Sequence, residues 1–189
     1  ETVLVSVIVA NNEVGSLNAI RELAGLVHEQ SDALFHTDAV QTLGKMPVNV
    51  QDWGVDLASF GAHKLYGPKG VGALYVREGV ELDPQLSGGS QENDRRAGTE
   101  DVAGLTGFAE AAGLAVEELE DESERLVDMR EKLWSGISSR VPGAIRNSPE
   151  EECLPNTLNV SFPNVPSRDM VGELSRKGFG VSSGSACTS

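Results

Sequence analysis

The chain has 189 residues, of which 39% are hydrophobic and 23% charged, and its formal net charge is −14. This composition is typical of a globular protein with a buried core, and the acidic excess argues against nucleic acid as a partner, because phosphate binding needs clustered lysine and arginine. No apolar run approaches the roughly 20 residues that a membrane helix needs, and no basic, apolar leader opens the sequence, so we expect no membrane association.

Two cysteines, Cys153 and Cys187, are too few for a disulfide framework. They lie in different sequence contexts, which favours a reducing compartment with at least one free thiol, and we expect the cytoplasm. The sequence begins inside a strand-like run without a methionine, and it stops two residues after Cys187. We therefore expect a fragment that lacks both termini of the whole protein.

The first part of the sequence predicts a strand, a helix and a second strand. Residues 2–10 are rich in β-branched side chains, which predicts a strand buried on both faces of a parallel sheet. A helix is expected over 17–30, with Ser16 available as its cap. The second strand is expected over 33–37, and it ends at Asp38.

Polar side chains follow the ends of three expected strands. Asn12 comes after the first strand, Asp38 after the second, and His63 and Lys64 after a third strand over 55–60. Because crossover connections make such strands parallel, their carboxyl ends meet at one edge of the sheet, where α/β proteins bind ligands. The sequence therefore predicts an α/β fold with a mostly parallel sheet, flanking helices and a ligand site at that edge.

The rest of the sequence predicts a further strand, a long helical region, a short strand and a final helix. These elements are expected over 71–77, 100–140, 157–162 and 167–177. A polar, glycine-rich loop is expected over 86–101, and Gly113 offers a point for a break in the helical region. We place a domain boundary at residue 118, so that the two domains cover 1–118 and 119–189.

Lys64 and Asp38 together point to pyridoxal phosphate chemistry. Taken alone, the lysine is typical of a solvated surface residue, and the aspartate is equally suited to cap a helix or turn. However, a lysine in a partly desolvated cleft attacks carbonyls as the free amine, and pyridoxal phosphate enzymes pair such a lysine with an aspartate on the pyridinium nitrogen. We favour this interpretation because the two residues follow adjacent strands. His63 is either a core histidine or a cofactor contact.

Cys187 is a candidate nucleophile. Its neighbours are serine, glycine, alanine and threonine, which cannot anchor it in a core, so an accessible loop is expected. A thiol without function on such a loop is an equal alternative. The three histidines lack metal-ligand spacing and no CxxC or HExxH motif occurs, so we expect no resident metal; hydrolase and P-loop motifs are absent as well.

Six stretches of the sequence resemble the NifS/IscS-type cysteine desulfurases, which are class V aminotransferases of pyridoxal phosphate fold type I. The stretches are NNEVG, FHTDAVQTLGK, SFGAHKLYGPKGVGALYVR, RRAGTED, LPNTLNVSF and VSSGSACTS. They keep the family's order along the chain, whereas residues 113–150 match loosely. The resemblance implies part of the large cofactor-binding domain over 1–118, and part of a small α+β domain carrying the catalytic-cysteine loop over 119–189.

The resemblance also implies which residues hold pyridoxal 5'-phosphate. Lys64 would form the Schiff base, and Asp38 would pair with the pyridine nitrogen. Gln41 would hydrogen-bond the phenolic oxygen of the ring, with Asn12 on the same side. His63 would lie in the phosphate-binding segment.

Two further residues would connect the site to partners. Thr99 would reach the phosphate of the partner subunit's cofactor, which implies a homodimer. Cys187 would take sulfur from L-cysteine as a persulfide, leaving L-alanine, and would pass it to acceptor proteins for iron–sulfur cluster assembly or tRNA thiolation. With an iron–sulfur scaffold as partner, Cys187 would also be able to ligate a cluster transiently.

Two alternatives to a desulfurase stay open. One is another class V enzyme, an aminotransferase or a selenocysteine lyase, in which Cys187 is incidental. The other is a non-catalytic scaffold protein that keeps the fold without the cofactor.

The sequence departs from the family pattern in two ways. Gly61 stands where many relatives have a serine that hydrogen-bonds the phosphate, which predicts weaker cofactor binding. The family's phosphate loop and ring-stacking histidine would lie before Glu1 and its substrate arginine after Ser189. We therefore expect the fragment alone to be inactive.

Overall fold

The computed structural model describes residues 2–184, which form two compact units. The first unit holds residues 2–9 and 18–120, and the second holds residues 10–17 and 121–184. The short segment 10–17 therefore belongs to a different unit from the residues on either side of it. The domain boundary expected at residue 118 stays a prediction.

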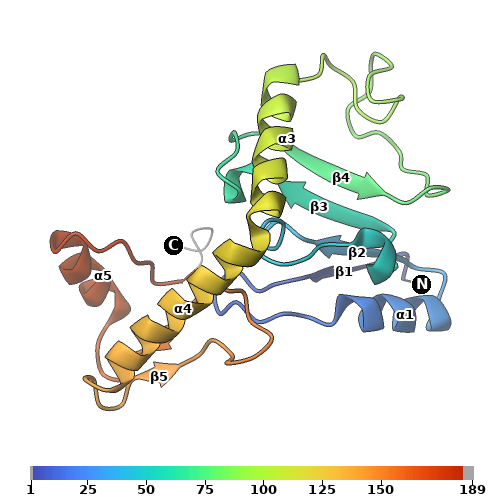
Figure 1. Cartoon of the computed structure of the whole chain (residues 1–189). Helices are drawn as coiled ribbons and strands as arrows, with labels where there is room; N and C mark the ends of the chain where they lie inside the picture. Colours follow the sequence, from blue (N-terminus) through green and yellow to red (C-terminus); the bar gives the residue numbers. More distant parts are fainter. Residues whose placement is uncertain (1, 185–189) are drawn as a thin grey trace. The chain divides into compact units, whose positions relative to one another are not determined.

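The first unit is built on a four-stranded sheet in the order β1-β2-β3-β4 (Figure 1). The strands are β1 (Leu4–Ile8), β2 (Leu34–Asp38), β3 (Leu57–Gly61) and β4 (Gly72–Val76). The first three strands run parallel, and β4 is antiparallel to β3. This mostly parallel sheet confirms the predicted α/β fold class.

Helix α1 (Ile20–Gln30) covers one face of this sheet. Ile20 and Ala24 are buried in a cluster with Val9, which directly follows β1, and with the sheet residues Phe35 and Ala58. The short helix α2 (Val50–Trp53) leads into β3, and the Asn49 side chain caps its first turn. Most fully buried side chains of this cluster are small or branched aliphatic groups, which fill the narrow space between a helix and a parallel sheet.

Helix α3 (Val102–Glu117) packs by small residues against the turn that follows β3. This turn opens with a 3₁₀ helix, η1 (Ala62–Lys64), and continues to Gly70. A Cβ atom built on Gly107 would lie only 2.6 Å from Pro68 Cγ, and one built on Gly67 would lie 3.3 Å from Ala111 Cβ. Glycine and alanine on α3 therefore let the turn come close to the helix backbone.

The second unit contains most of α4 (Leu119–Ser138), the two-stranded sheet β5 (Ile145–Arg146) and β6 (Val160–Ser161), and α5 (Ser167–Arg176). The segment 10–17 is joined to it by backbone hydrogen bonds: Leu154 N–H donates to Gly15 O, and Leu17 N–H donates to Glu152 O. Arg130 lies buried beside this junction and donates to Leu154 O at 2.8 Å. None of the helices in residues 2–184 is both long and apolar enough to cross a membrane.

Three local expectations are wrong. The first strand is not buried on both faces, because β1 lies at an edge of the sheet and Leu4 is exposed. The first helix begins at Ile20 rather than at residue 17, and Ser16 does not cap it, since Ser16 forms a bridge with Cys153 instead. Gly113 does not break α3, which continues to Glu117.

Candidate active site

Asp38 is the last residue of β2, at the carboxyl edge of the sheet. It lies opposite Ile8 on β1 and Ser59 on β3, and its side chain is half-buried. Its Oδ1 accepts the backbone N–H of Val40 at 2.9 Å, which fixes the carboxylate as the chain turns away from the strand. Within residues 2–184 this is the one hydrogen bond of the carboxylate, so further acceptor positions remain for a ligand.

Gln41 follows three residues later, in the turn that leaves this edge. It is half-buried, and the neighbouring turn is fixed by Thr42, whose N–H and hydroxyl both donate to Ala39 O. Gln41 therefore lies in an ordered turn three residues after Asp38. Its amide group is a possible hydrogen-bond donor to a ligand at the same edge.

His63 and Lys64 lie in η1, directly after β3, and both are exposed. Since β2 and β3 are parallel, the two residues follow the strand end that neighbours Asp38. Ala62 is fully buried and its carbonyl accepts N–H groups from Leu65 and Gly67. The buried start of the turn thus fixes the backbone of Lys64, while the lysine side chain is exposed to solvent.

The missing side chain of Gly61 leaves room for the His63 ring. A Cβ atom at Gly61 would lie 3.3 Å from both Cε1 and Nδ1 of His63, and 3.4 Å from Val40 Cγ1. A serine at this position would require the imidazole to move by a few tenths of an ångström. Glycine at position 61, where many relatives have serine, therefore fits the close approach of the His63 ring.

Lys45 is a further cationic residue at this site. Its pKa is lowered, first by burial and second by the positive charge of Lys64 nearby. Lys45 and Lys64 therefore lie close enough to influence each other, and their amines suit an anionic ligand such as pyridoxal 5'-phosphate, while Asp38 suits its ring nitrogen. The sequence interpretation missed Lys45, although the lysine lies inside one of the six matching stretches.

His36 is a second residue that the sequence interpretation missed. It precedes Asp38 by two residues on β2, and its ring nitrogens contact Ser6 Oγ at 2.7 Å and Ser59 Oγ at 2.8 Å. Burial lowers the pKa of His36, and the charge of Asp38 opposes this shift in part. Histidines in strands are common, so only the cross-strand register could have pointed to it.

The remaining three predicted site residues are Asn12, Thr99 and Cys187. Asn12 is exposed in the segment that belongs to the second unit. Thr99 is exposed in the loop before α3, where Asp101 caps the helix by accepting the N–H of Gly104. Cys187 lies outside the described residues. The roles assigned to all seven residues stay predictions.

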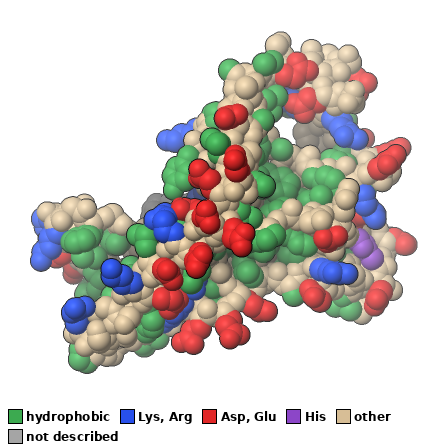
Figure 2. Space-filling view, viewed as in Figure 1, with side chains coloured by type: hydrophobic (Ala, Val, Ile, Leu, Met, Phe, Trp, Pro, Cys, Tyr) green, Lys and Arg blue, Asp and Glu red, His purple; other side chains and the backbone are tan. Residues whose placement is uncertain are grey.

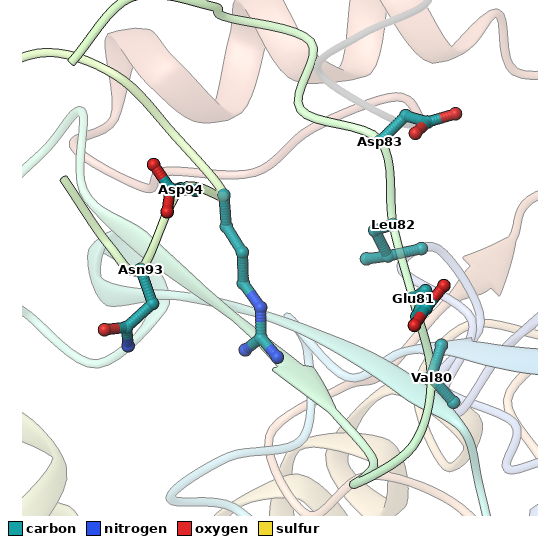
Figure 3. Close-up of a pocket in the computed structure, with 7 residues that line it drawn as sticks. Val80, Glu81, Leu82, Asp83, Asn93 and Asp94 are labelled. Atoms are coloured by element: carbon teal, nitrogen blue, oxygen red, sulfur yellow. The ribbon is translucent and has the colours of Figure 1, made fainter. Parts of the chain in front are cut away.

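A hollow lies between residues 80–83 and residues 93–95 (Figure 3). Its volume is about 540 Å³, and its lining residues are Val80, Glu81, Leu82, Asp83, Asn93, Asp94 and Arg95. Figure 3 shows these side chains on two loop segments around an open space. None of the predicted site residues lines it, and residues 2–184 contain no cluster of three metal-ligating side chains.

The comparison with protein families decides the relationship. The aminotransferase class-V model matches residues 1–189. The chain belongs to the class-V aminotransferase family. Pyridoxal phosphate is the cofactor of this family, which confirms the predicted cofactor.

Curated class-V relatives that resemble the chain are named cysteine desulfurases. The chain is 48% identical to cysteine desulfurase IscS of Dictyoglomus turgidum over 189 residues, covering 100% of the chain and 48% of the relative. It is 41% identical to cysteine desulfurase IscS of Methanosarcina thermophila, covering 100% of the chain and 46% of the relative. The chain therefore spans about half the length of the curated relatives it matches.

Solved structures of NifS-like and related proteins share the fold of this chain. A NifS-like protein aligns with a TM-score of 0.92 and 44% identity, over 96% of this chain and 49% of that one. DndA from Streptomyces lividans aligns with a TM-score of 0.80 and 34% identity, over 93% and 50% of the two chains. The predicted resemblance and the fold type I assignment are thereby confirmed.

Proposed function

We propose that the protein containing this chain is a pyridoxal phosphate-dependent cysteine desulfurase that converts L-cysteine to L-alanine. The main support is the 48% identity to a cysteine desulfurase in a chain that keeps Asp38 and Lys64 at the ends of two adjacent parallel strands. The chain spans about half of that relative, so activity, substrate and partners are proposed for the whole protein.

The residues at the sheet edge suit this cofactor by charge and by placement. When bound, pyridoxal phosphate supplies the electron sink that makes cleavage of the C–S bond of cysteine feasible. Asp38, held by the Val40 amide, would keep a proton on the ring nitrogen. Gln41 would donate to the phenolic oxygen, and the side chains of Lys45 and His63 would donate hydrogen bonds to the phosphate.

Lys64 would attach the cofactor through its amine. Its place in η1 favours this role, because the buried Ala62 carbonyl anchors the turn while the lysine side chain remains accessible. After substrate has displaced it, the free amine would be positioned to move a proton at the substrate carbon.

Cys187 would accept the sulfur. Its thiolate would form a bond to the sulfur atom as the C–S bond of substrate breaks, which yields a persulfide on Cys187; the electron pair of the broken bond stays on the three-carbon fragment, which takes up a proton to give alanine. Cys153 is the poorer candidate: burial raises the pKa of its thiol, and its Sγ donates to Val14 O at 3.6 Å.

The proposed partners follow from this chemistry. The persulfide would pass to sulfur-acceptor proteins such as an iron–sulfur scaffold, where Cys187 would ligate a cluster transiently, and Thr99 would complete the site of a second subunit in a homodimer. We also propose a cytoplasmic location. Acidic side chains gather along α4 (Figure 2), in keeping with a partner other than nucleic acid.

The cofactor assignment is tested by reduction of the holoenzyme with borohydride, followed by peptide mass mapping. We expect the pyridoxyl group on Lys64, and loss of the visible absorbance in Lys64→Ala. The matched control is Lys69→Ala, since Lys69 is exposed in the same turn and should bind cofactor normally. Label on any other lysine would contradict the assignment.

The sulfur-transfer step is tested by trapping persulfides during turnover of L-cysteine. We expect persulfide on Cys187, and loss of sulfur transfer in Cys187→Ala with cofactor binding intact, whereas Cys153→Ala should keep its activity. Persulfide on Cys153 would contradict the role of Cys187. Formation of a keto acid instead of alanine would favour an aminotransferase, and absence of visible absorbance from the complete protein would favour a scaffold.

A further inference from the structure

The parallel sheet carries a row of polar side chains that leads to Asp38. Ser6 on β1 pairs in register with His36 on β2, and Ser59 on β3 pairs with Asp38. Side chains two residues apart on a strand point to the same face, so His36 and Asp38 share one face of the sheet. The His36 imidazole contacts both serines, at 2.7 Å and 2.8 Å.

This arrangement makes His36 a link across three strands. The bond to Ser59 joins the strand that ends at Asp38 to the strand that leads to Lys64, two residues before each strand ends. The bond to Ser6 joins the same strand to β1. Backbone hydrogen bonds alone allow a twisted sheet to adjust locally, whereas a side chain bonded on both sides resists such movement.

The imidazole also has the charge state that suits a neighbour of Asp38. Burial lowers the pKa of His36 and so favours the neutral ring. A neutral imidazole has one donor and one acceptor nitrogen, and serine hydroxyls can fill either role, so both contacts are satisfied without a positive charge. The negative charge of Asp38 then stays undiminished for a cationic ring nitrogen.

We propose that His36 is a positioning residue for Asp38, because its hydrogen bonds to Ser6 and Ser59 fix the carboxyl ends of β2 and β3 relative to each other. The inference rests on the proposed function, since it assumes that Asp38 holds the pyridine nitrogen. His36 itself would not touch the cofactor. It would set where the Asp38 carboxylate lies with respect to the turn that carries Lys64.

The test uses the holoenzyme and compares two histidine substitutions in the same unit. His36→Phe keeps an aromatic ring but removes both hydrogen bonds. His28→Phe is the matched control, because His28 contacts a carboxylate at the opposite end of the sheet, that of Asp56, at 2.8 Å. Both variants should lose thermal stability, so stability alone does not separate a positioning role from a packing role.

The readouts that separate the two roles are cofactor affinity and the visible spectrum. We expect His36→Phe to weaken pyridoxal phosphate binding about tenfold, the ratio that corresponds to one good hydrogen bond, and to shift the pH midpoint of the Schiff-base absorbance. His28→Phe should leave both at wild-type values. His36→Gln, which can still donate and accept, should recover part of the loss.

Wild-type affinity and spectrum in His36→Phe would overturn the inference. If that variant does not fold, Ser59→Ala removes only the bond to β3, and it should weaken cofactor binding by a smaller factor in the same direction; an unchanged Ser59→Ala would likewise overturn it. A wild-type enzyme that carries no cofactor on Lys64 would instead refute the proposed function, so the two failures are distinguishable.

Discussion

Two aspartates at opposite ends of the same strand pair show how one side chain serves different purposes. Asp56 directly precedes β3 and is completely buried. Its Oδ2 accepts the Phe35 N–H at 2.6 Å and contacts His28 Nε2 at 2.8 Å. Its Oδ1 lies in ion-pair contact with Arg77, although without hydrogen-bond geometry. Asp38, at the other end, is half-buried and accepts one backbone N–H.

The number of protein partners distinguishes the structural carboxylate, Asp56, from the carboxylate that is available to a ligand, Asp38. Three donors from α1, β2 and the end of β4 converge on Asp56, so its charge is compensated inside the protein and closes that end of the sheet. Asp38 leaves most of its acceptor capacity to whatever binds at the carboxyl edge. A buried acid with every partner in the protein indicates architecture, whereas a partly partnered acid at a strand end indicates a ligand site.

The strongest test of this contrast is to truncate both aspartates. Asp56→Ala should lower the free energy of unfolding by roughly 3 kcal/mol, because it leaves the Phe35 N–H buried without an acceptor and removes the partner of Arg77 and His28. Asp38→Ala should cost less than about 1 kcal/mol while abolishing cofactor binding. Urea titration and absorbance titration with pyridoxal phosphate give the two numbers. Equal losses of stability would remove the distinction.

The carboxyl end is open but should still be rigid, because its turn packs on α3. Gly107→Ala places a Cβ 2.6 Å from Pro68 Cγ, so the ring must shift and the unfolding free energy should fall by about 1 kcal/mol. Gly113→Ala is the matched control on the same helix, since nothing lies within 4 Å of its Cβ, and it should gain up to about 1 kcal/mol from helix propensity. Thermal unfolding of the two variants measures the difference. A stabilising Gly107→Ala would show that the turn yields freely.

Adding a hydroxyl at position 61 should raise the affinity of the carboxyl edge of the sheet for the cofactor. Gly61→Ser would offer the phosphate a donor, and the His63 ring can move the few tenths of an ångström required, so cofactor affinity should rise about threefold to tenfold. Gly61→Ala has the same Cβ without the hydroxyl and should give no gain. The comparison is made by equilibrium dialysis; equal affinities for both variants would show that the backbone already satisfies the phosphate.

The smallest expected effect is a pH dependence of stability that originates beside Asp38. The pKa of His36 is lowered by burial, so the unfolded chain binds a proton more readily than the folded one. The stability that His36 contributes is therefore complete above about pH 6.5, the value for a free histidine, and is lost as the pH falls through the lowered folded pKa. Urea unfolding midpoints between pH 7 and pH 5 measure this loss. His36→Gln should flatten this part of the profile, and an unchanged slope would assign it to other groups.

The carboxyl edge of the sheet, with Asp38 and Lys64, could be predicted from the sequence. The cluster around Asp56 at the opposite end could not. Asp38 and Lys64 follow β-branched or apolar runs that read as strands, and the parallel-strand rule then places them at one edge. Asp56 lies within such a run, and nothing local distinguishes it from a misplaced polar residue. Its partners His28 and Arg77 come from elements 28 and 21 positions away, so the cluster becomes visible only when α1, β3 and β4 have been assembled.

Long-range pairing also explains the local errors. Ser16 has the composition of a helix cap, but it pairs with Cys153, and tertiary hydrogen bonding overrides that local preference. The same pairing places Asn12, whose predicted role stays a prediction, in the second unit, because residues 152–154 bind its segment. Spacing along the chain carries no information about such a partner.

The attachment of segment 10–17 has a consequence for the order of events during synthesis. Its bonds reach far along the chain: Asn159 Nδ2 donates to Glu13 O across 146 positions, and Cys153 Sγ donates to Val14 O across 139. At typical translation rates the segment waits on the order of ten seconds for these residues to leave the ribosome. Until then segment 10–17 lacks these hydrogen-bond partners, however early the sheet of the first unit has formed. The two units should therefore mature in sequence, with the second closing only after residue 159 has left the ribosome.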